Sequence, residues 1–256
     1  MALLLGVGFG LAAEKPPPKL ESLVGERLEF RLKWQGISAA DAVLEVLDGG
    51  DGQIIFRATA RTVGIVALLY PVNSQINSTA EIAGFRAVSY VKSGKEGRGA
   101  EEVDEIVFDL ENGLAFRTDD GETREPVEVP EHVHDPFSAF YAFRTSEVDE
   151  DGIVELTISD GKKTQTGRVQ IVGRERVKTP AGEFDTVKIA PQLEGLGGVF
   201  KKSPGATLYI WVTDDEWRRP VMLRSKVSVG SFTARLTEWS HPAAQRPVTV
   251  TYSDSR

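Results

Sequence analysis

Two of the three histidines lie two positions apart, in the segment His132-Val133-His134-Asp135. In an extended strand these positions face the same side, so both imidazoles could bind one metal ion. A zinc site needs a further ligand, yet no other His-rich motif occurs and the chain has no cysteine. The alternative is a solvated loop in which Asp135 caps the following helix. We favour the loop, and we expect neither a metal site nor a cofactor.

A nucleophile is equally hard to assemble. Ser138 is close to His134, as a serine triad would require. It falls, however, in the first turn of a predicted helix, where its hydroxyl serves the backbone, and no serine lies in a Gly-x-Ser-x-Gly motif. The carboxylates of residues 214–216 could act in glycoside hydrolysis, but their place between two strong strands is typical of a charged turn. The sequence therefore predicts a non-enzymatic protein without catalytic residues.

Three arginines are candidates for contact with an anion. Arg218 and Arg219 are adjacent and precede a proline, which is unusual in a chain with a net charge of -8. Arg144 ends a predicted helix, and its apolar stem is long enough to reach an acidic partner. We name Arg144, Arg218 and Arg219 as possible anion-contacting residues.

The composition limits the class of protein. The 256 residues are 41% hydrophobic and 27% charged, which is typical of a globular protein with a substantial core. The acidic balance and the lack of a basic stripe argue against nucleic-acid binding.

The N-terminus resembles an export signal. Residues 3–13 are apolar and too few to span a membrane, and small residues at 10, 12 and 13 stand where a signal peptidase would recognise a cleavage site after 12 or 13. We expect a cleaved signal peptide at 1–13, with a non-cleaved anchor as the alternative. Without a cysteine the protein cannot be a lipoprotein by the usual route, and after cleavage it should not be an integral membrane protein. Export without disulfides fits a bacterial periplasm.

The elements that must position any site are mostly strands. Residues 28–34 and 208–213 alternate apolar and polar side chains, and glycine-rich turns separate the runs. We expect a proline-rich linker at 14–24, one β domain at 25–240 and a C-terminal tail at 241–256.

Two stretches depart from that pattern. Asp135 as N-cap and Pro136 at the first helical position predict a helix over 135–144. Residues 64–72 are apolar without alternation, and they indicate either a short element that plugs the core or an apolar lip around a cavity.

The chain resembles the DUF3108 family of uncharacterised secreted bacterial proteins. The resemblance rests on Gly25-Glu26-x-Leu28-x-Phe30, on residues 135–144, on Thr179 to Phe184, and on residues 211–221. It implies an exported, β-rich protein with a curved or barrel-like sheet, and no catalytic residues.

We therefore predict an all-β fold: a large curved antiparallel sheet or partly open, clam-like barrel with one short capping helix. The first functional hypothesis is a periplasmic protein that binds or carries a lipid or acyl ligand in a cavity. The alternative is a cell-envelope assembly factor with a packed interior that meets a protein partner on its outer surface. A hydrolase of envelope polymer would need a cleft with convergent carboxylates. The candidate ligand-binding residues are Phe30, Trp34, Phe56, Leu68, Leu69, Tyr70, Phe140 and Tyr141.

Overall fold

The computed structural model describes residues 16–192, 205–228 and 230–245. Its strands form one antiparallel sheet in the order β10-β11-β12-β13-β14-β15-β1-β2-β3-β4-β5-β6-β7-β8, with β9 also paired to β7. The strands are β1 (Arg27–Trp34), β2 (Ile37–Gly50), β3 (Gln53–Thr62), β4 (Val72–Glu81), β5 (Arg86–Glu96), β6 (Glu101–Asp109), β7 (Leu114–Asp119), β8 (Glu122–Thr123), β9 (Val127–Glu128), β10 (Ile153–Ser159), β11 (Thr164–Thr179), β12 (Gly182–Pro191), β13 (Thr207–Thr213), β14 (Pro220–Val227) and β15 (Gly230–Ser240).

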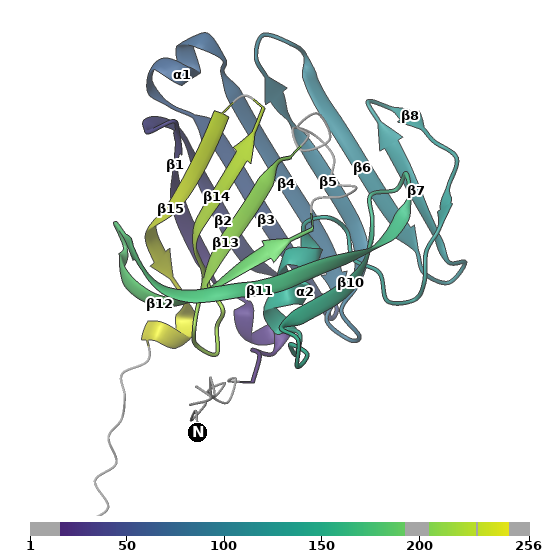
Figure 1. Ribbon diagram of the computed structural model, residues 1–256. Helices are drawn as coiled ribbons and strands as arrows, with labels where there is room; N and C mark the ends of the chain where they lie inside the picture. Colours follow the sequence, from purple (N-terminus) through teal and green to yellow (C-terminus); the bar gives the residue numbers. More distant parts are fainter. Residues whose placement is uncertain (1–15, 193–204, 229, 246–256) are drawn as a thin grey trace, which may run out of the picture.

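Among the described residues, four short helical segments accompany the sheet: η1 (Leu20–Leu23), α1 (Gly64–Leu69), α2 (Ser138–Thr145) and η2 (Pro242–Gln245). Figure 1 shows that the sheet curves, so that β10 and β11 cross in front of the wall formed by β2 to β5. Helix α2 lies inside this curve, where it contacts β4 on the wall and β10 in front. The predicted all-β fold, with its large curved sheet, is confirmed. The sheet is not closed into a barrel.

Segment 129–135 runs through the gap between the β5–β7 part of the sheet and β10 at the opposite end of the strand order. On one side of the gap the Ala87 amide of β5 donates to the Val133 carbonyl, at 2.9 Å. On the other side the His134 amide donates to the Thr157 carbonyl, and the Ser159 amide donates to the His134 carbonyl, both at 2.9 Å. We call this gap, with the segment in it, the seam.

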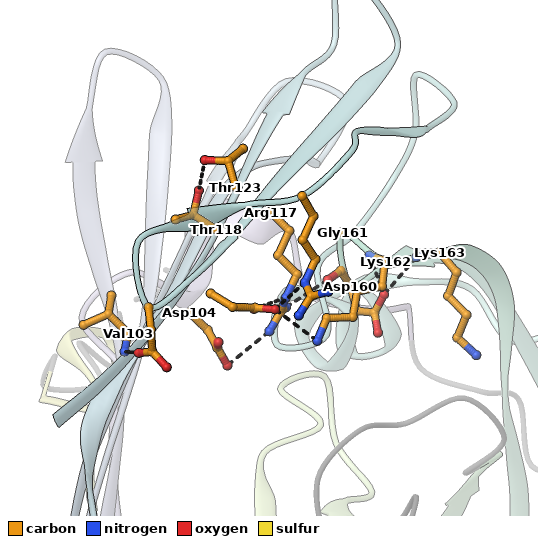
Figure 2. Close-up of polar contacts among 12 residues, drawn as sticks. Val103, Asp104, Arg117, Thr118, Thr123, Asp160, Gly161, Lys162 and Lys163 are labelled. Atoms are coloured by element: carbon orange, nitrogen blue, oxygen red, sulfur yellow. Dashed lines mark hydrogen bonds and ion pairs between the residues drawn. The ribbon is translucent and has the colours of Figure 1, made fainter. Parts of the chain in front are cut away.

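Side chains reinforce the seam (Figure 2). Arg117 of β7 donates to the Asp160 carbonyl in the turn between β10 and β11, at 2.9 Å, and forms an ion pair with Asp104 of β6 at 3.1 Å. Asp119 also binds Arg117, and it lies 3.3 Å from Lys162 in the same turn. One cluster of charges thus joins the β6–β7 end of the sheet to the β10–β11 end.

Helix α2 begins later than predicted. Asp135 still caps it, because its Oδ1 accepts hydrogen bonds from the amides of Phe137, at 2.8 Å, and Ser138, at 3.1 Å. Pro136 and Phe137 form the turn that this carboxylate closes, so the regular helix starts at Ser138. Tyr141 then stacks on Phe56 of β3, with ring centroids 3.9 Å apart.

The folded part extends beyond the predicted domain at both ends. Leu20 and Leu23 of η1 are buried with Phe56 and Tyr141, so residues 20–24 belong to the core and not to a linker. His241, placed at the start of the tail, is buried, and its Nε2 lies 2.9 Å from the Ser22 carbonyl oxygen. The predicted signal peptide, 1–13, and residues 246–256 of the predicted tail lie outside the described residues.

Candidate functional site

An apolar cavity of about 150 Å³ lies between α2 and strands β10 to β13. Helix α2 contributes three of its lining side chains, and the four strands contribute most of the remaining apolar ones. The apolar lining residues of α2 and the strands are Ala139, Phe140, Phe143, Leu156, Ile158, Val169, Ile189, Pro191, Leu208 and Ile210, and Pro136 joins them from the turn before α2. Arg168 and Gln192 also line it and are exposed, so they mark its opening to solvent. The cavity can therefore hold an apolar group, and its opening can contact a polar part of the same ligand.

A buried ion pair fixes the helix that forms one wall of this cavity. Arg144, near the C-terminus of α2, donates to both carboxylate oxygens of Glu26, at 2.6 and 2.9 Å. Its Nη2 also donates to the Trp217 carbonyl, at 3.0 Å. Burial lowers the pKa of Arg144, but Glu26 outweighs this effect and the pKa is raised overall. The predicted acidic partner of Arg144 is therefore Glu26, on the chain just before β1.

The other two candidate arginines also contact the protein itself. Arg219 is buried, with its Nε 3.6 Å from Glu26 Oε2 and its guanidinium 4.0 Å from the centre of the Trp239 ring. Burial lowers the pKa of Arg219, and Glu26 offsets only part of that effect. Arg218 donates to the Ser146 carbonyl just after α2, at 2.6 Å. Arg144 and Arg218 thus tie the end of α2 to the rest of the chain, and Arg219 shares the Glu26 carboxylate with Arg144.

Comparison with known proteins matches residues 29–237 to the model of a family described as "Protein of unknown function (DUF3108)". The chain belongs to the DUF3108 family. No curated protein matches this DUF3108 chain.

Among solved structures, one with a TM-score above 0.5 resembles the DUF3108 chain in fold, and two others align with lower scores. A beta-barrel-like protein of the domain of unknown function DUF1849, from Brucella abortus, aligns over 86% of this chain and 98% of its own, with a TM-score of 0.51 and 11% identity. A "putative lipoprotein" from Parabacteroides distasonis aligns over 88% of this chain and 100% of its own, at 12% identity and a TM-score of 0.33. A "putative exported protein" with a YmcC-like fold, from Bacteroides fragilis, aligns over 90% and 100%, at 13% identity and a TM-score of 0.30.

The candidate ligand-binding residues do not form one group. Phe140 lines the cavity, whereas Phe30, Phe56 and Tyr141 are buried in the core beside the sheet. Trp34 is half-buried at the end of β1. The remaining three, which are exposed on and just after α1, are Leu68, Leu69 and Tyr70.

Helix α1 neither plugs the core of the DUF3108 chain nor borders the cavity. It has no buried residue, so the interpretation of residues 64–72 as a core plug is wrong. Figure 1 places α1 where β3 ends and β4 begins, and α2 toward the opposite ends of these strands. No residue of 64–72 lines the cavity, so the predicted lip at its mouth is absent there.

The residues considered for catalysis serve the backbone. The Ser138 hydroxyl accepts from the Asp135 amide, and Asp215 accepts from the amides of Trp217 and Arg218, which makes residues 214–217 the predicted charged turn. Within the described ranges no three His, Cys, Asp or Glu side chains could hold a metal ion. Every helix in those ranges is too short or too polar to cross a bilayer.

The sequence did not single out most of the residues that form the cavity. Leu156, Ile158, Ile189 and Ile210 occupy alternate positions on their strands, and this period-two pattern was the available signal. It indicates an inward face, but it does not distinguish a side chain that borders an empty space from one that is closely packed.

Proposed function

We propose that this DUF3108 chain is a non-enzymatic periplasmic protein that binds the apolar end of a lipid-like molecule. The proposal rests on the cavity between α2 and strands β10 to β13, with its apolar walls and two polar residues at its opening. Apolar lining with a few polar groups is the usual character of a small-molecule site. The N-terminal apolar stretch and the lack of cysteine support export.

The volume of the cavity limits the size of the ligand. Sites for whole drug-sized molecules measure about 300–1,000 Å³. A cavity of about 150 Å³ is half of the lower limit, and a cavity of that size with similar walls holds a single benzene ring. We therefore propose that the cavity takes the last few carbons of an acyl chain, while the remainder leaves through the opening.

The opening has groups suited to the polar part of such a ligand. Arg168 lies 2.8 Å from Glu155 through its Nε, and both side chains are about half exposed. The Arg168 guanidinium can therefore turn to a carboxylate or phosphate at small cost, because exposed ion pairs contribute little stability. Gln192 adds an amide with both a donor and an acceptor.

A second function, a cell-envelope assembly factor that uses its outer surface, is favoured by the packing of the interior. Four separate clusters of buried side chains fill the inside of the curved sheet, centred on Leu28, Phe56, Ile106 and Phe143. Such a filled interior suits a scaffold for a protein partner more than a carrier for a large ligand.

Native mass spectrometry of the protein, purified gently from the periplasm and then extracted with organic solvent, tests the first function. We expect a co-purifying acyl species at near-stoichiometric amount, and rebinding when dodecanoate is added to the stripped protein. In the variant Ala139→Leu the longer side chain points into the cavity and should abolish both signals. Val172→Leu, at an exposed position on β11, is the matched control.

A clean mass without ligand, together with no shift on addition of dodecanoate or phospholipid, would contradict the acyl-binding function. The assembly role would then be preferred, and capture of envelope proteins would be the next experiment. Equal binding by wild type and Ala139→Leu would place the ligand elsewhere and would also contradict the proposed site.

A further inference from the structure

Helix α1 exposes its apolar face. Ile65, Leu68 and Leu69 are spaced i, i+3 and i+4, which puts them on one side of the helix. In a globular protein such a stripe normally faces the core. Here Leu68 is 79% exposed, Leu69 74% and Ile65 60%, so the stripe faces solvent.

Neighbouring residues enlarge this apolar surface and hold it rigidly. Tyr70, just after α1, is 53% exposed, and its ring lies against Gly97 in the turn between β5 and β6. The Gly97 amide donates to the Pro71 carbonyl at 2.7 Å, and the Val63 amide donates to the Ala39 carbonyl at 2.9 Å. We call Ile37, Ile65, Leu68, Leu69 and Tyr70 the α1 tip; Ile37 lies at the start of β2, the strand that α1 contacts, and is 54% exposed.

Exposed cations lie on the strands and turns that border the α1 tip. Arg98 is in the same β5–β6 turn as Gly97, and the other three are at the ends of β1, β3 and β5. They are Lys33, Arg61, Lys95 and Arg98. None of the four forms an ion pair with any described residue, although the chain carries a net charge of -8. Acidic residues lie opposite two of these cations: Glu101 faces Lys95 across β5 and β6, and Asp41, which is paired with Arg31, faces Arg61 across β2 and β3. Glu96 is paired with Lys92.

We propose that the α1 tip docks the protein on the surface of an anionic lipid membrane. Leucine and isoleucine side chains would enter the boundary between headgroups and acyl chains, with Tyr70 at headgroup level. The unpaired cations would face the lipid phosphates, as juxtamembrane basic residues do. This proposal does not depend on the cavity, because the α1 tip and the cavity share no residue.

The shape and size of the α1 tip favour a membrane over a second copy of the chain. Figure 1 shows α1 projecting where β3 ends and β4 begins, so a flat bilayer can reach it. The α1 tip consists of five side chains that are 53–79% exposed, whereas a stable protein interface uses about 20–30 residues on each side. A bilayer requires no such complementary surface.

Co-sedimentation of the full chain with vesicles tests the proposal. We expect binding to vesicles of phosphatidylcholine mixed equally with phosphatidylglycerol, and weaker binding to pure phosphatidylcholine. Leu68→Gln with Leu69→Gln should lower the partition coefficient about tenfold or more, because two apolar anchors are lost. Lys95→Glu with Arg98→Glu should reduce binding to the anionic vesicles and should remove most of its salt dependence.

The control is Val107→Gln, at an exposed valine on β6 away from α1, which should bind like the wild type. Because every variant keeps the same N-terminal residues, a difference between variants reports on the α1 tip alone. The proposal is overturned if wild type ignores anionic vesicles, or if the leucine variant binds as tightly as the control. It is also overturned if the leucine substitutions dissociate a dimer in sedimentation, since the occupant would then be a second copy.

Discussion

Two ion clusters join distant parts of this chain, and they differ in their contact with water. In the first, Glu26 and Arg144 are essentially inaccessible, and Arg219 is nearly so. In the second, at the seam, Arg117 is 11% exposed and Asp104 is 35% exposed. Charges removed from water are costly unless each is paired, whereas charges at a wet surface are screened and individually weak.

The difference assigns each cluster a separate role. The buried cluster fixes α2 beside the cavity through a bidentate ion pair between Arg144 and Glu26. Two parallel hydrogen bonds constrain the orientation of the helix as well as its position. The seam cluster ties together two ends of a sheet that backbone hydrogen bonds already bridge through His134. We expect the buried cluster to determine where α2 lies and the seam cluster to adjust how firmly the curve is held.

The largest effect should come from removing the shared carboxylate of the buried cluster. Glu26→Gln keeps the shape of the side chain but removes the paired carboxylate from the buried Arg144 and Arg219, which then keep only the weaker influence of Asp215. We expect the free energy of unfolding to fall by about 3–5 kcal/mol. Urea denaturation followed by circular dichroism measures this loss.

Glu45→Gln is the matched control, because Glu45 pairs with Arg27 at 2.8 Å while both side chains remain partly exposed. It should lower the free energy of unfolding by less than about 1 kcal/mol. Equal losses for the two variants would remove the distinction between the buried cluster and an ordinary surface pair.

The next largest effect is the pH dependence of stability caused by His134, whose imidazole is buried in the seam. Burial, with a smaller contribution from His132, lowers the pKa of His134 from 6.5 to about 4. Between pH 6.5 and 4 the unfolded chain binds a proton at this residue and the folded chain does not, so stability is lost as the pH falls. The shift corresponds to about 3 kcal/mol across that window.

Urea midpoints at neutral pH and near pH 4.5 test this in His134→Phe, which keeps a ring against Phe85 and cannot titrate. The variant should lose less stability on acidification than the wild type. His132→Phe, at an exposed position, is the control and should keep most of the wild-type loss, because it removes only the smaller contribution to the lowered pKa of His134. An unchanged pH dependence in His134→Phe would mean that the seam opens to water enough to charge the imidazole.

Removal of the central seam cation should have a smaller effect. Arg117→Met breaks the bonds to Asp104, Asp119 and the Asp160 carbonyl, and we expect a loss of about 2 kcal/mol. High salt should narrow the difference from wild type, which Glu26→Gln should not show.

Hydrogen exchange locates the change, because the amides of Ala87, His134 and Ser159 bridge the seam and should exchange faster in Arg117→Met. Arg124→Met removes a half-exposed partner of Asp119 and should lower the free energy of unfolding by less than about 1 kcal/mol. If Arg117→Met leaves those three amides protected, the seam depends on its backbone bonds alone.

The sequence predicted the sheet well because period-two alternation depends only on local residues. The same reasoning placed α2 through Asp135 and anticipated an acidic partner for Arg144 from the length of its side chain. It could not name Glu26, which lies 118 positions away and is adjacent only in the folded chain.

The cavity and the α1 tip were harder to predict for different reasons. The space beside Ile189 and Ile210 depends on how strongly β10 to β13 curve around α2, and alternation carries no information on curvature. Residues 64–72 were predicted as a short apolar element, but the exposure of their side chains depends on where α1 lies relative to the sheet. Hydrophobic composition alone does not distinguish a buried helix from an exposed one.

The smallest change in the free energy of unfolding should come from replacing Asp104, and it should be a gain where the other substitutions cause a loss. Burial raises the pKa of Asp104, Arg117 lowers it in part, and the neighbouring Asp119 raises it further. Folding therefore disfavours the charged form, and Asp104→Asn should stabilise the protein slightly at neutral pH. We expect about 0.5 kcal/mol at most, since a third of the side chain is exposed and solvent screens its charge.

Asp119→Asn should behave in the opposite way. Burial opposes its charge, but hydrogen bonds from Arg124 and Arg117 are among the contacts that hold the pKa of Asp119 well below its usual value. Its contribution is complete above pH 3.8 and is lost as the pH falls through the lower folded pKa, whereas the penalty from Asp104 fades as acid protonates it. Urea midpoints of the two variants at neutral pH should therefore move in opposite directions. Movement in the same direction would mean that the carboxylates do not compete for Arg117, and that the seam is held by geometry more than by charge.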